Sequence, residues 1–222
     1  MKNSFWAVPW FSIPVLLFFI LGLFFQLFVP TGHEILYLNP WRTAPLNFFF
    51  KYWTQMGEAP VFIAIGLLSM AWRYRFALLI ALTGLVVIPT SYFMKESVRK
   101  DRPITFFEKI GMRDAVNADS TVYLNRGKTS FPSGHSMAAF AMYGLMAFFS
   151  DKKRNWFALA CAITAILVAF SRIFLVQHFL ADILGGAFIG LVIAHLIWWF
   201  NKKYLGRLVA LDKGLIQRFK QA

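Results

Sequence analysis

The sequence has few charged residues and a single cysteine. Only 15% of its 222 residues are charged, whereas 59% are hydrophobic. A soluble domain typically carries about 25% charged residues, so this deficit excludes an ordinary soluble domain and favours a membrane protein. Because Cys161 is alone, no intramolecular disulfide can form, and the cysteine content does not indicate whether the compartment is oxidising or reducing. The first apolar run lacks a convincing small-residue cleavage site, so we expect a retained helix and not a signal peptide.

Long apolar runs are the main feature that the sequence does have. A helix needs roughly 20 mostly apolar residues to cross a bilayer. Six segments approach this length: residues 10–29, 55–72, 76–94, 133–149, 156–175 and 179–200. The second segment is the weakest, because Glu58 lies near its start. The proline-broken stretch 38–53 is too polar to span and is predicted to lie at the membrane interface.

These segments predict an all-α fold, in which residues 1–222 form one membrane domain with six transmembrane helices. Residues 1–54 would hold the first helix and the interfacial segment, residues 55–200 the helical core, and residues 201–222 a basic amphipathic tail. Alternating basic and apolar residues in the tail favour contact with anionic headgroups over a protein-docking site. We expect no nucleic-acid partner, and the sequence leaves the oligomeric state open.

The placement of lysine and arginine predicts the orientation, because cytoplasmic loops carry an excess of these residues. The short loops after the second and fourth segments are basic, with Arg73 and Arg75 in one and three basic residues at 152–154 in the other. The tail is basic as well. We therefore expect both termini in the cytoplasm and the connection 95–132 on the extracytoplasmic face of a bacterial-type inner membrane.

Ionisable residues gather at the extracytoplasmic ends of the predicted helices. Such residues in or beside membrane helices are costly and usually functional. They are Lys95 and Arg102 after the third segment, His135 at the start of the fourth, Arg172 at the end of the fifth, and His178 and Asp182 at the start of the sixth. Solubility alone does not explain polar groups from four separate helix ends.

The spacing of these residues suits anion binding and nucleophilic attack. Lys95 and Arg102 are seven residues apart, so they face one way if the helix continues to Pro103. His178 and Asp182 are four residues apart, on one helical face, where the carboxylate can hold one imidazole nitrogen and leave the other free to attack.

The run "SFPSGHS" at 130–136 opens the fourth segment. Backbone N–H groups exposed at a helix N-terminus favour an anion, and Gly134 beside Ser133 permits close approach of the backbone. His135 follows, in a position to donate a proton. Each feature alone has an ordinary structural explanation: a snorkelling pair of cations, a His–Asp hydrogen bond or a capping turn. Their occurrence together on one face of the membrane favours an active site.

Three motifs in this order resemble those of the type 2 phosphatidic acid phosphatases (PAP2). These enzymes are the membrane branch of a superfamily that includes soluble acid phosphatases and vanadium haloperoxidases. The family patterns are K-x6-RP, PSGH and SR-x5-H-x3-D. The sequence has "KESVRKDRP" at 95–103, "PSGH" at 132–135 and "SRIFLVQHFLAD" at 171–182. All three motifs are complete with their spacing intact, and the six apolar segments extend the resemblance over most of the chain.

The resemblance implies a role for each matched residue. His178 is the nucleophile that forms a phosphohistidine, Asp182 orients and activates it, and His135 protonates the leaving oxygen and then activates water. The phosphoryl oxygens are bound by Lys95, Arg102, Ser133, Gly134 and Arg172. No metal or other cofactor is expected, because three cations and a helix N-terminus supply the charge stabilisation that a metal otherwise gives.

We therefore expect an integral membrane phosphatase that hydrolyses a lipid phosphate or diphosphate at the extracytoplasmic face. One alternative is a lipid-diphosphate-dependent phosphotransferase, which shares the covalent intermediate and differs in the acceptor. A second is an inactive lipid-binding or transport-like protein, against which the intact His135, His178 and Asp182 argue. The basic loop 104–130 is either a headgroup selector or a solvated loop. Its bases suit undecaprenyl diphosphate, phosphatidylglycerophosphate, phosphatidate or lipid A.

Overall fold

The computed structural model describes residues 5–150 and 155–219. Within these ranges the chain forms α-helices, 3₁₀ turns and one π-helical turn, and it contains no strand. The α-helices are α1 (Pro9–Phe28), α2 (His33–Leu36), α3 (Ala44–Trp53), α4 (Ala59–Trp72), α5 (Tyr74–Val98), α6 (Pro103–Lys109), α7 (Gly134–Phe148), α8 (Asn155–Phe174), α9 (Leu180–Phe200) and α10 (Leu215–Phe219). The all-α prediction is confirmed for the described residues.

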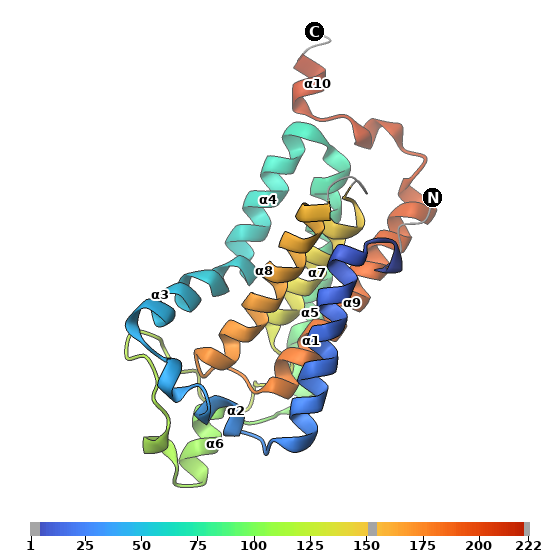
Figure 1. Ribbon diagram of the computed structural model, residues 1–222. Coiled ribbons are helices and arrows are strands. Elements are labelled where there is room, and N and C mark those ends of the chain that lie inside the picture. Colours follow the sequence, from blue (N-terminus) through green and yellow to red (C-terminus); the bar gives the residue numbers. More distant parts are fainter. Residues whose placement is uncertain (1–4, 151–154, 220–222) are drawn as a thin grey trace.

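Helix α7 forms the centre of the bundle. It packs against α8, α9 and α5, while α1 covers α8 and α9 from one side (Figure 1). Most of its side chains are buried, among them Met137 and Phe140. A helix that is apolar around its whole circumference is suited to such a position, because every face meets another helix.

Two glycines allow α9 to approach α7 closely. A Cβ atom added at Gly186 would lie 2.4 Å from the carbonyl oxygen of Ser133, and one at Gly190 would lie 2.3 Å from that of Met137. No real Cβ atom comes so close, so only glycine fits at either position. The Gly-x-x-x-Gly step therefore serves packing within the chain.

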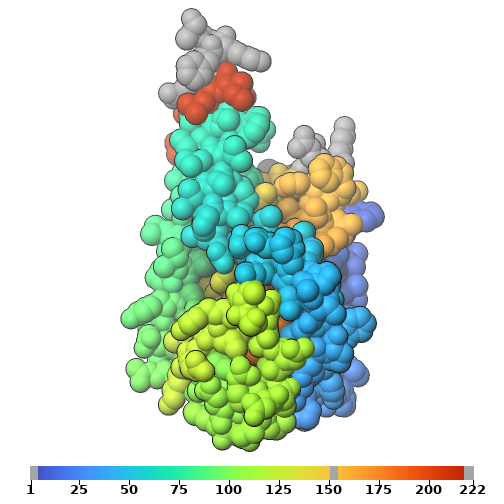
Figure 2. Space-filling view, turned by 90° about the vertical axis from the view of Figure 1, so that its left-hand side faces the viewer, coloured from blue at the N-terminus to red at the C-terminus, as the bar shows by residue number. Residues whose placement is uncertain are grey.

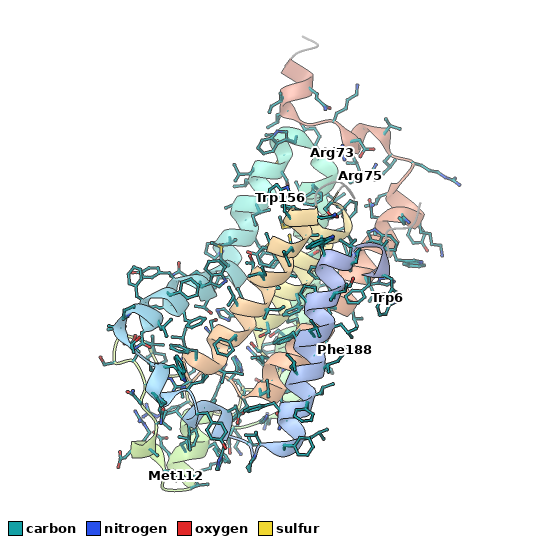
Figure 3. The ribbon with its side chains drawn as sticks, viewed as in Figure 1. Trp6, Arg73, Arg75, Met112, Trp156 and Phe188 are labelled. Atoms are coloured by element: carbon teal, nitrogen blue, oxygen red, sulfur yellow. The ribbon has the colours of Figure 1, made fainter. Side chains whose placement is uncertain are left out.

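Helices α5 and α7 run antiparallel along the bundle. The start of α7 faces the end of α5, because a Cβ atom at Gly134 would lie 3.2 Å from Ser91 Oγ and 3.7 Å from Lys95 Nζ. At the other end the rings of Phe76 and Phe149 meet, with centroids 5.5 Å apart. Figure 3 shows Arg73 and Arg75 at that second end, with the tail, and Met112 at the opposite end of the molecule.

Four helical segments are long and apolar enough to cross a membrane: Pro9–Phe28, Tyr74–Lys109, Asn155–Phe174 and Leu180–Leu205. A possible fifth is the pair Ala44–Gly57 and Ala59–Trp72, which is bent by 55°. The chain is thus a multi-pass membrane protein. Six spans are not confirmed, because α7 has only 15 residues.

The predicted span 55–72 has a different form from the one expected. A 3₁₀ turn, Thr54–Gly57, follows α3, and α4 begins only at Ala59. Glu58 between them is extended, with φ −103° and ψ 159°. Pro60 lacks a backbone N–H to continue a helix, which explains why the chain bends here.

Helix α5 also ends earlier than the spacing of Lys95 and Arg102 requires. It stops at Val98, and Arg99 adopts a left-handed conformation with φ 48°. Arg102 instead caps the start of α6. The prediction that Lys95 and Arg102 share one helical face is therefore wrong, and the two side chains approach the same site from separate elements.

The tail is not the single amphipathic helix that the sequence predicted. It consists of a π-helical turn, Asn201–Leu205, a 3₁₀ turn, Val209–Asp212, and α10. Arg75 holds it by donating hydrogen bonds to Asp212, to Asn201 and to the carbonyl oxygens of Leu205 and Leu208. The predicted basic loop 152–154 lies outside the described residues.

We expect Gly190→Ala to destabilise the protein by about 1–3 kcal/mol, because the added methyl group overpacks the contact between α9 and α7. The measurement is the apparent melting temperature of the full chain in detergent. Gly84→Ala in α5 is the matched control, since a Cβ atom there meets nothing within 4 Å. If both variants melt at the wild-type temperature, the close contact at Gly190 is refuted.

Candidate active site

Three cationic side chains approach one region from three different elements. Lys95 lies in the last turn of α5, Arg102 at the cap of α6, and Arg172 in the last turn of α8. Both arginine side chains are buried. Arg172 donates a hydrogen bond from Nη1 to Thr54 Oγ1 at 2.8 Å, but its buried Nε has no partner. A buried N–H group without a partner is costly, so this guanidinium is suited to receive an anion.

The start of α7 lies beside these cations. Ser133 caps the helix, because its hydroxyl oxygen accepts a hydrogen bond from the backbone N–H of Ser136 at 3.3 Å. The backbone N–H of Ser133 donates to the carbonyl oxygen of Asp182, which joins the starts of α7 and α9. Gly134 follows, and a Cβ atom added there would lie 3.7 Å from Lys95 Nζ. The predicted helix N-terminus at Ser133 and Gly134 is thus present, and Lys95 adds positive charge to it.

His178 lies buried in the connection between α8 and α9. Its Nε2 is 3.1 Å from Nη1 of Arg102. Because a guanidinium group only donates hydrogen bonds, Nε2 accepts, and the ring proton belongs on Nδ1. Burial lowers the pKa of His178 well below its usual range, and the neighbouring Arg102 and Arg172 lower it further. The imidazole is therefore neutral at neutral pH, with the lone pair of Nε2 directed at a cation.

Asp182 is fully buried and has partners from three parts of the chain. Its Oδ1 accepts from Lys100 Nζ at 2.7 Å, and its Oδ2 accepts from Ser130 Oγ at 2.5 Å and from the backbone N–H of Phe179 at 2.9 Å. The expected hydrogen bond to His178 is not formed, since Nδ1 and Oδ2 are 3.8 Å apart and Nδ1 has no hydrogen-bond partner. Phe179 caps α9, so His178 lies before the helix and not on its face. The carboxylate is close enough to act on the ring by its charge.

His135 contacts a residue for which the motifs gave no role. Its Nε2 is 3.1 Å from Oε1 of Glu58. Lys100, Ser130 and Thr54 are likewise residues of the site that sequence reasoning missed. Lys100 and Ser130 each lie close to a motif residue, but nothing in their type or spacing distinguishes them from their neighbours.

The loop 104–130 is anchored to the segment before α3 and to the connection between α8 and α9. Phe107 is buried, and Phe106 packs edge-on against Phe179. Asn117 bonds to Asn39, and Asn125 donates to Gln177 beside His178. In Figure 2 this yellow-green segment lies against the blue segment that precedes α4. The loop therefore belongs to the wall of the site.

Two of the loop's bases are already paired. Lys109 binds Asp101 at 2.6 Å and Arg126 binds Glu108 at 2.9 Å. These pairs weaken the expectation that the same bases bind a multiply charged headgroup. Among residues 5–150 and 155–219, no three His, Cys, Asp or Glu side chains lie close enough together to hold a metal ion.

We expect Lys100→Met to destabilise the protein by about 1–3 kcal/mol, because it leaves the buried Asp182 carboxylate without its cation. The loss should be smaller than that of a fully buried pair, since the Lys100 side chain is 30% exposed. Arg99→Met is the control, because Arg99 pairs with Glu96 only at the surface, at 3.6 Å. Equal apparent melting temperatures for the two variants would contradict this role of Lys100.

Comparison with known proteins assigns the chain to a family. Residues 71–205, which contain all three motifs, match the PAP2 superfamily. The chain is 33% identical over 97 residues to phosphatidylglycerophosphatase B of Bacillus subtilis, covering 40% of this chain and 48% of that protein. It thus spans about half the length of this curated relative. It is 23% identical over 153 residues to the undecaprenyl-diphosphatase BcrC of Bacillus subtilis, covering 69% of this chain and 72% of that one.

A solved structure resembles the whole bundle. The transmembrane PAP2-type phosphatidylglycerolphosphate phosphatase of Bacillus subtilis superimposes with a TM-score of 0.56 at 25% identity. The match covers 88% of this chain and 98% of the other. The family match over most of the chain, together with this structure, supports the resemblance that the motifs indicated: the chain belongs to the PAP2 superfamily.

Proposed function

We propose that the protein is a phosphatase for a lipid phosphate or diphosphate and that it acts through a phosphohistidine at His178. The observation that carries this proposal is the geometry of the His178 ring, whose neutral Nε2 presents a lone pair to the Arg102 guanidinium. A phosphoryl group bound by Arg102 would bring its phosphorus atom next to that lone pair. The named activities of the relatives, phosphatidylglycerophosphatase and undecaprenyl-diphosphatase, support the same class of substrate.

In the first step Nε2 of His178 attacks the phosphorus atom, and the bond from phosphorus to the leaving oxygen breaks. His135 gives a proton to that oxygen, so the lipid leaves as an alcohol, or as a monophosphate if the substrate is a diphosphate. The phosphorylated ring keeps its proton on Nδ1 and becomes cationic. The Asp182 carboxylate, 3.8 Å from Nδ1, stabilises this charge.

In the second step a water molecule attacks the phosphorus atom and the bond to Nε2 breaks. His135 now accepts a proton from the water, which returns it to the form that began the cycle. Inorganic phosphate leaves, and His178 is again neutral. Apart from the substrate and water, each step uses only groups that this chain provides.

Charge on the phosphoryl oxygens is balanced by Lys95, Arg102 and Arg172, together with Ser133 and the backbone N–H group of Gly134. Preorganised donors of this kind are usually the largest source of transition-state stabilisation. They are arranged before substrate arrives, because Arg172 is held by Thr54 and Arg102 by the carbonyl oxygen of Gln177 at 2.9 Å. A phosphotransferase would use the same first step and replace water by a second lipid, so release of free phosphate distinguishes the two.

We infer six membrane crossings, with the bent pair α3–α4 and the helix α7 added to α1, α5, α8 and α9. The antiparallel packing of α7 along α5 supports this count, because α7 then extends between the same two ends as α5. Its short length is tolerable since other helices surround it and little of it meets lipid. The basic residues Arg73 and Arg75 and the tail gather at one end, which favours the cytoplasm for that end and the extracytoplasmic face for the site.

We expect His178→Ala to abolish both turnover and any acid-labile phosphoenzyme, because it removes the nucleophile. His135→Ala should slow a lipid monophosphate by about 10²–10⁴-fold, because an alkoxide needs a proton to leave. With a lipid diphosphate the same variant should accumulate phosphoenzyme, since water attack lacks its base. The measurement is trapping of labelled phosphate on each full-length variant. Label on His178→Ala would mean that the nucleophile is misassigned.

The proposed orientation is tested by labelling single cysteines in intact cells. In a Cys161→Ala background, Ser120→Cys in the loop should react with a membrane-impermeant maleimide, and Gln217→Cys in the tail should react only after the cells are opened. Both positions are exposed. Reaction of both cysteines from the same side would contradict the orientation.

A further inference from the structure

Glu58 is an acidic side chain in the segment expected to cross the membrane, and no motif of the family includes it. It lies at the bend between the 3₁₀ turn Thr54–Gly57 and α4. Its side chain is 41% exposed, and its Oε1 is 3.1 Å from Nε2 of His135. Placing an ionisable residue in a membrane segment costs free energy, and such residues usually have a function.

The turn that carries Glu58 is held firmly on the core. A Cβ atom at Gly57 would lie 2.7 Å from Val168 and 3.0 Å from the carbonyl oxygen of His135, so only glycine permits this contact with α8 and α7. Tyr143 donates a hydrogen bond to the carbonyl oxygen of Met56 at 3.0 Å, and Arg172 donates to Thr54. The turn that carries the carboxylate is thus held next to the ring by contacts with two helices, α7 and α8.

The charges around His135 indicate what the contact with Glu58 does. Burial of the ring opposes a positive charge on it, and so do Arg172 on α8 and Lys95 on α5. A general acid must carry that charge before it gives up its proton. Glu58, on the bend before α4, lies within hydrogen-bond distance of the ring and favours the charged form.

We infer that Glu58 is a positioning residue that orients His135 and stabilises its protonated form for transfer of a proton to the leaving group. This inference rests on the proposed function, in which His135 is the general acid. Because an ionised carboxylate only accepts hydrogen bonds, Nε2 of His135 holds its proton toward Glu58. The proton that moves in each step is then exchanged at Nδ1, and no other reactant is needed.

The test compares two substrates that share one lipid body. Dioctanoyl phosphatidate leaves as an alkoxide and needs the proton, whereas dioctanoyl diacylglycerol diphosphate leaves as a phosphate ester and needs it less. We expect Glu58→Gln in the full-length protein to lower kcat/KM for the monophosphate by about 10- to 100-fold, the effect of one hydrogen bond to a charged group. For the diphosphate we expect a loss of less than about threefold. Glu58→Asp, which keeps the charge, should recover part of the monophosphate activity.

Glu96→Gln is the matched control, because it removes a carboxylate from an exposed pair with Arg99 outside the loop and should leave both rates unchanged. In a His135→Ala background, adding Glu58→Gln should cause no further loss, since the two residues act as one unit. Equal losses on both substrates, or a further loss in the double variant, would overturn the inference and indicate a structural role. If His135→Ala itself fails to distinguish the substrates, the proposed role of His135 fails first and the inference fails with it.

Discussion

The buried carboxylate of Asp182 joins the parts of the chain that form the site. Lys100 reaches it from the connection between α5 and α6, Ser130 from the segment before α7, and Phe179 from the cap of α9. A fully buried carboxylate is very costly without partners, so these three contacts also fix how the loops meet. His178 directly precedes Phe179 in the chain, so the same arrangement also fixes its position.

The site as a whole is a balance of positive and negative side chains that lie close together. Lys95, Arg102 and Arg172 exceed the nearby carboxylates, so an anionic phosphoryl group completes the balance when it binds. In the proposed mechanism Asp182 and Glu58 have separate tasks, because Asp182 lies near His178 and Glu58 lies near His135. A carboxylate beside the nucleophile stabilises the ring after phosphorylation, and one beside the general acid stabilises it before proton transfer.

The sequence predicted the parts of this account that depend on long apolar runs and on complete motifs. Helices α8 and α9 lie within a residue or two of their predicted bounds, because each is an unbroken apolar segment between polar ends. The all-α class and the start of α7 at Gly134 also follow from such local signals. The motifs indicated which residue types face the site, and the structure brings them to one end of the bundle.

Other features depend on single backbone angles and could not be predicted. The left-handed Arg99 ends α5 early, leaves its own side chain exposed and directs the next residue, Lys100, inward to Asp182. In the basic run "RKDR" at 99–102 the motif marks Arg102, but no pattern distinguishes Lys100 from the exposed Arg99. Glu58 made the segment 55–72 the weakest predicted span. In the structure the chain bends at this residue, and α4 begins only after it. The broken tail likewise follows from contacts with Arg75 that lie far apart in sequence.

The central claim is that the protein fixes the tautomer of His178 so that Nε2 is the attacking atom. The most direct measurement is the position of phosphorus on the ring of the trapped intermediate, obtained by nuclear magnetic resonance of the phosphorylated His178 peptide against the two synthetic phosphohistidine isomers. The geometry of Arg102 and Asp182 predicts a bond from phosphorus to Nε2. A bond to Nδ1, or phosphate on a different residue, would contradict the account.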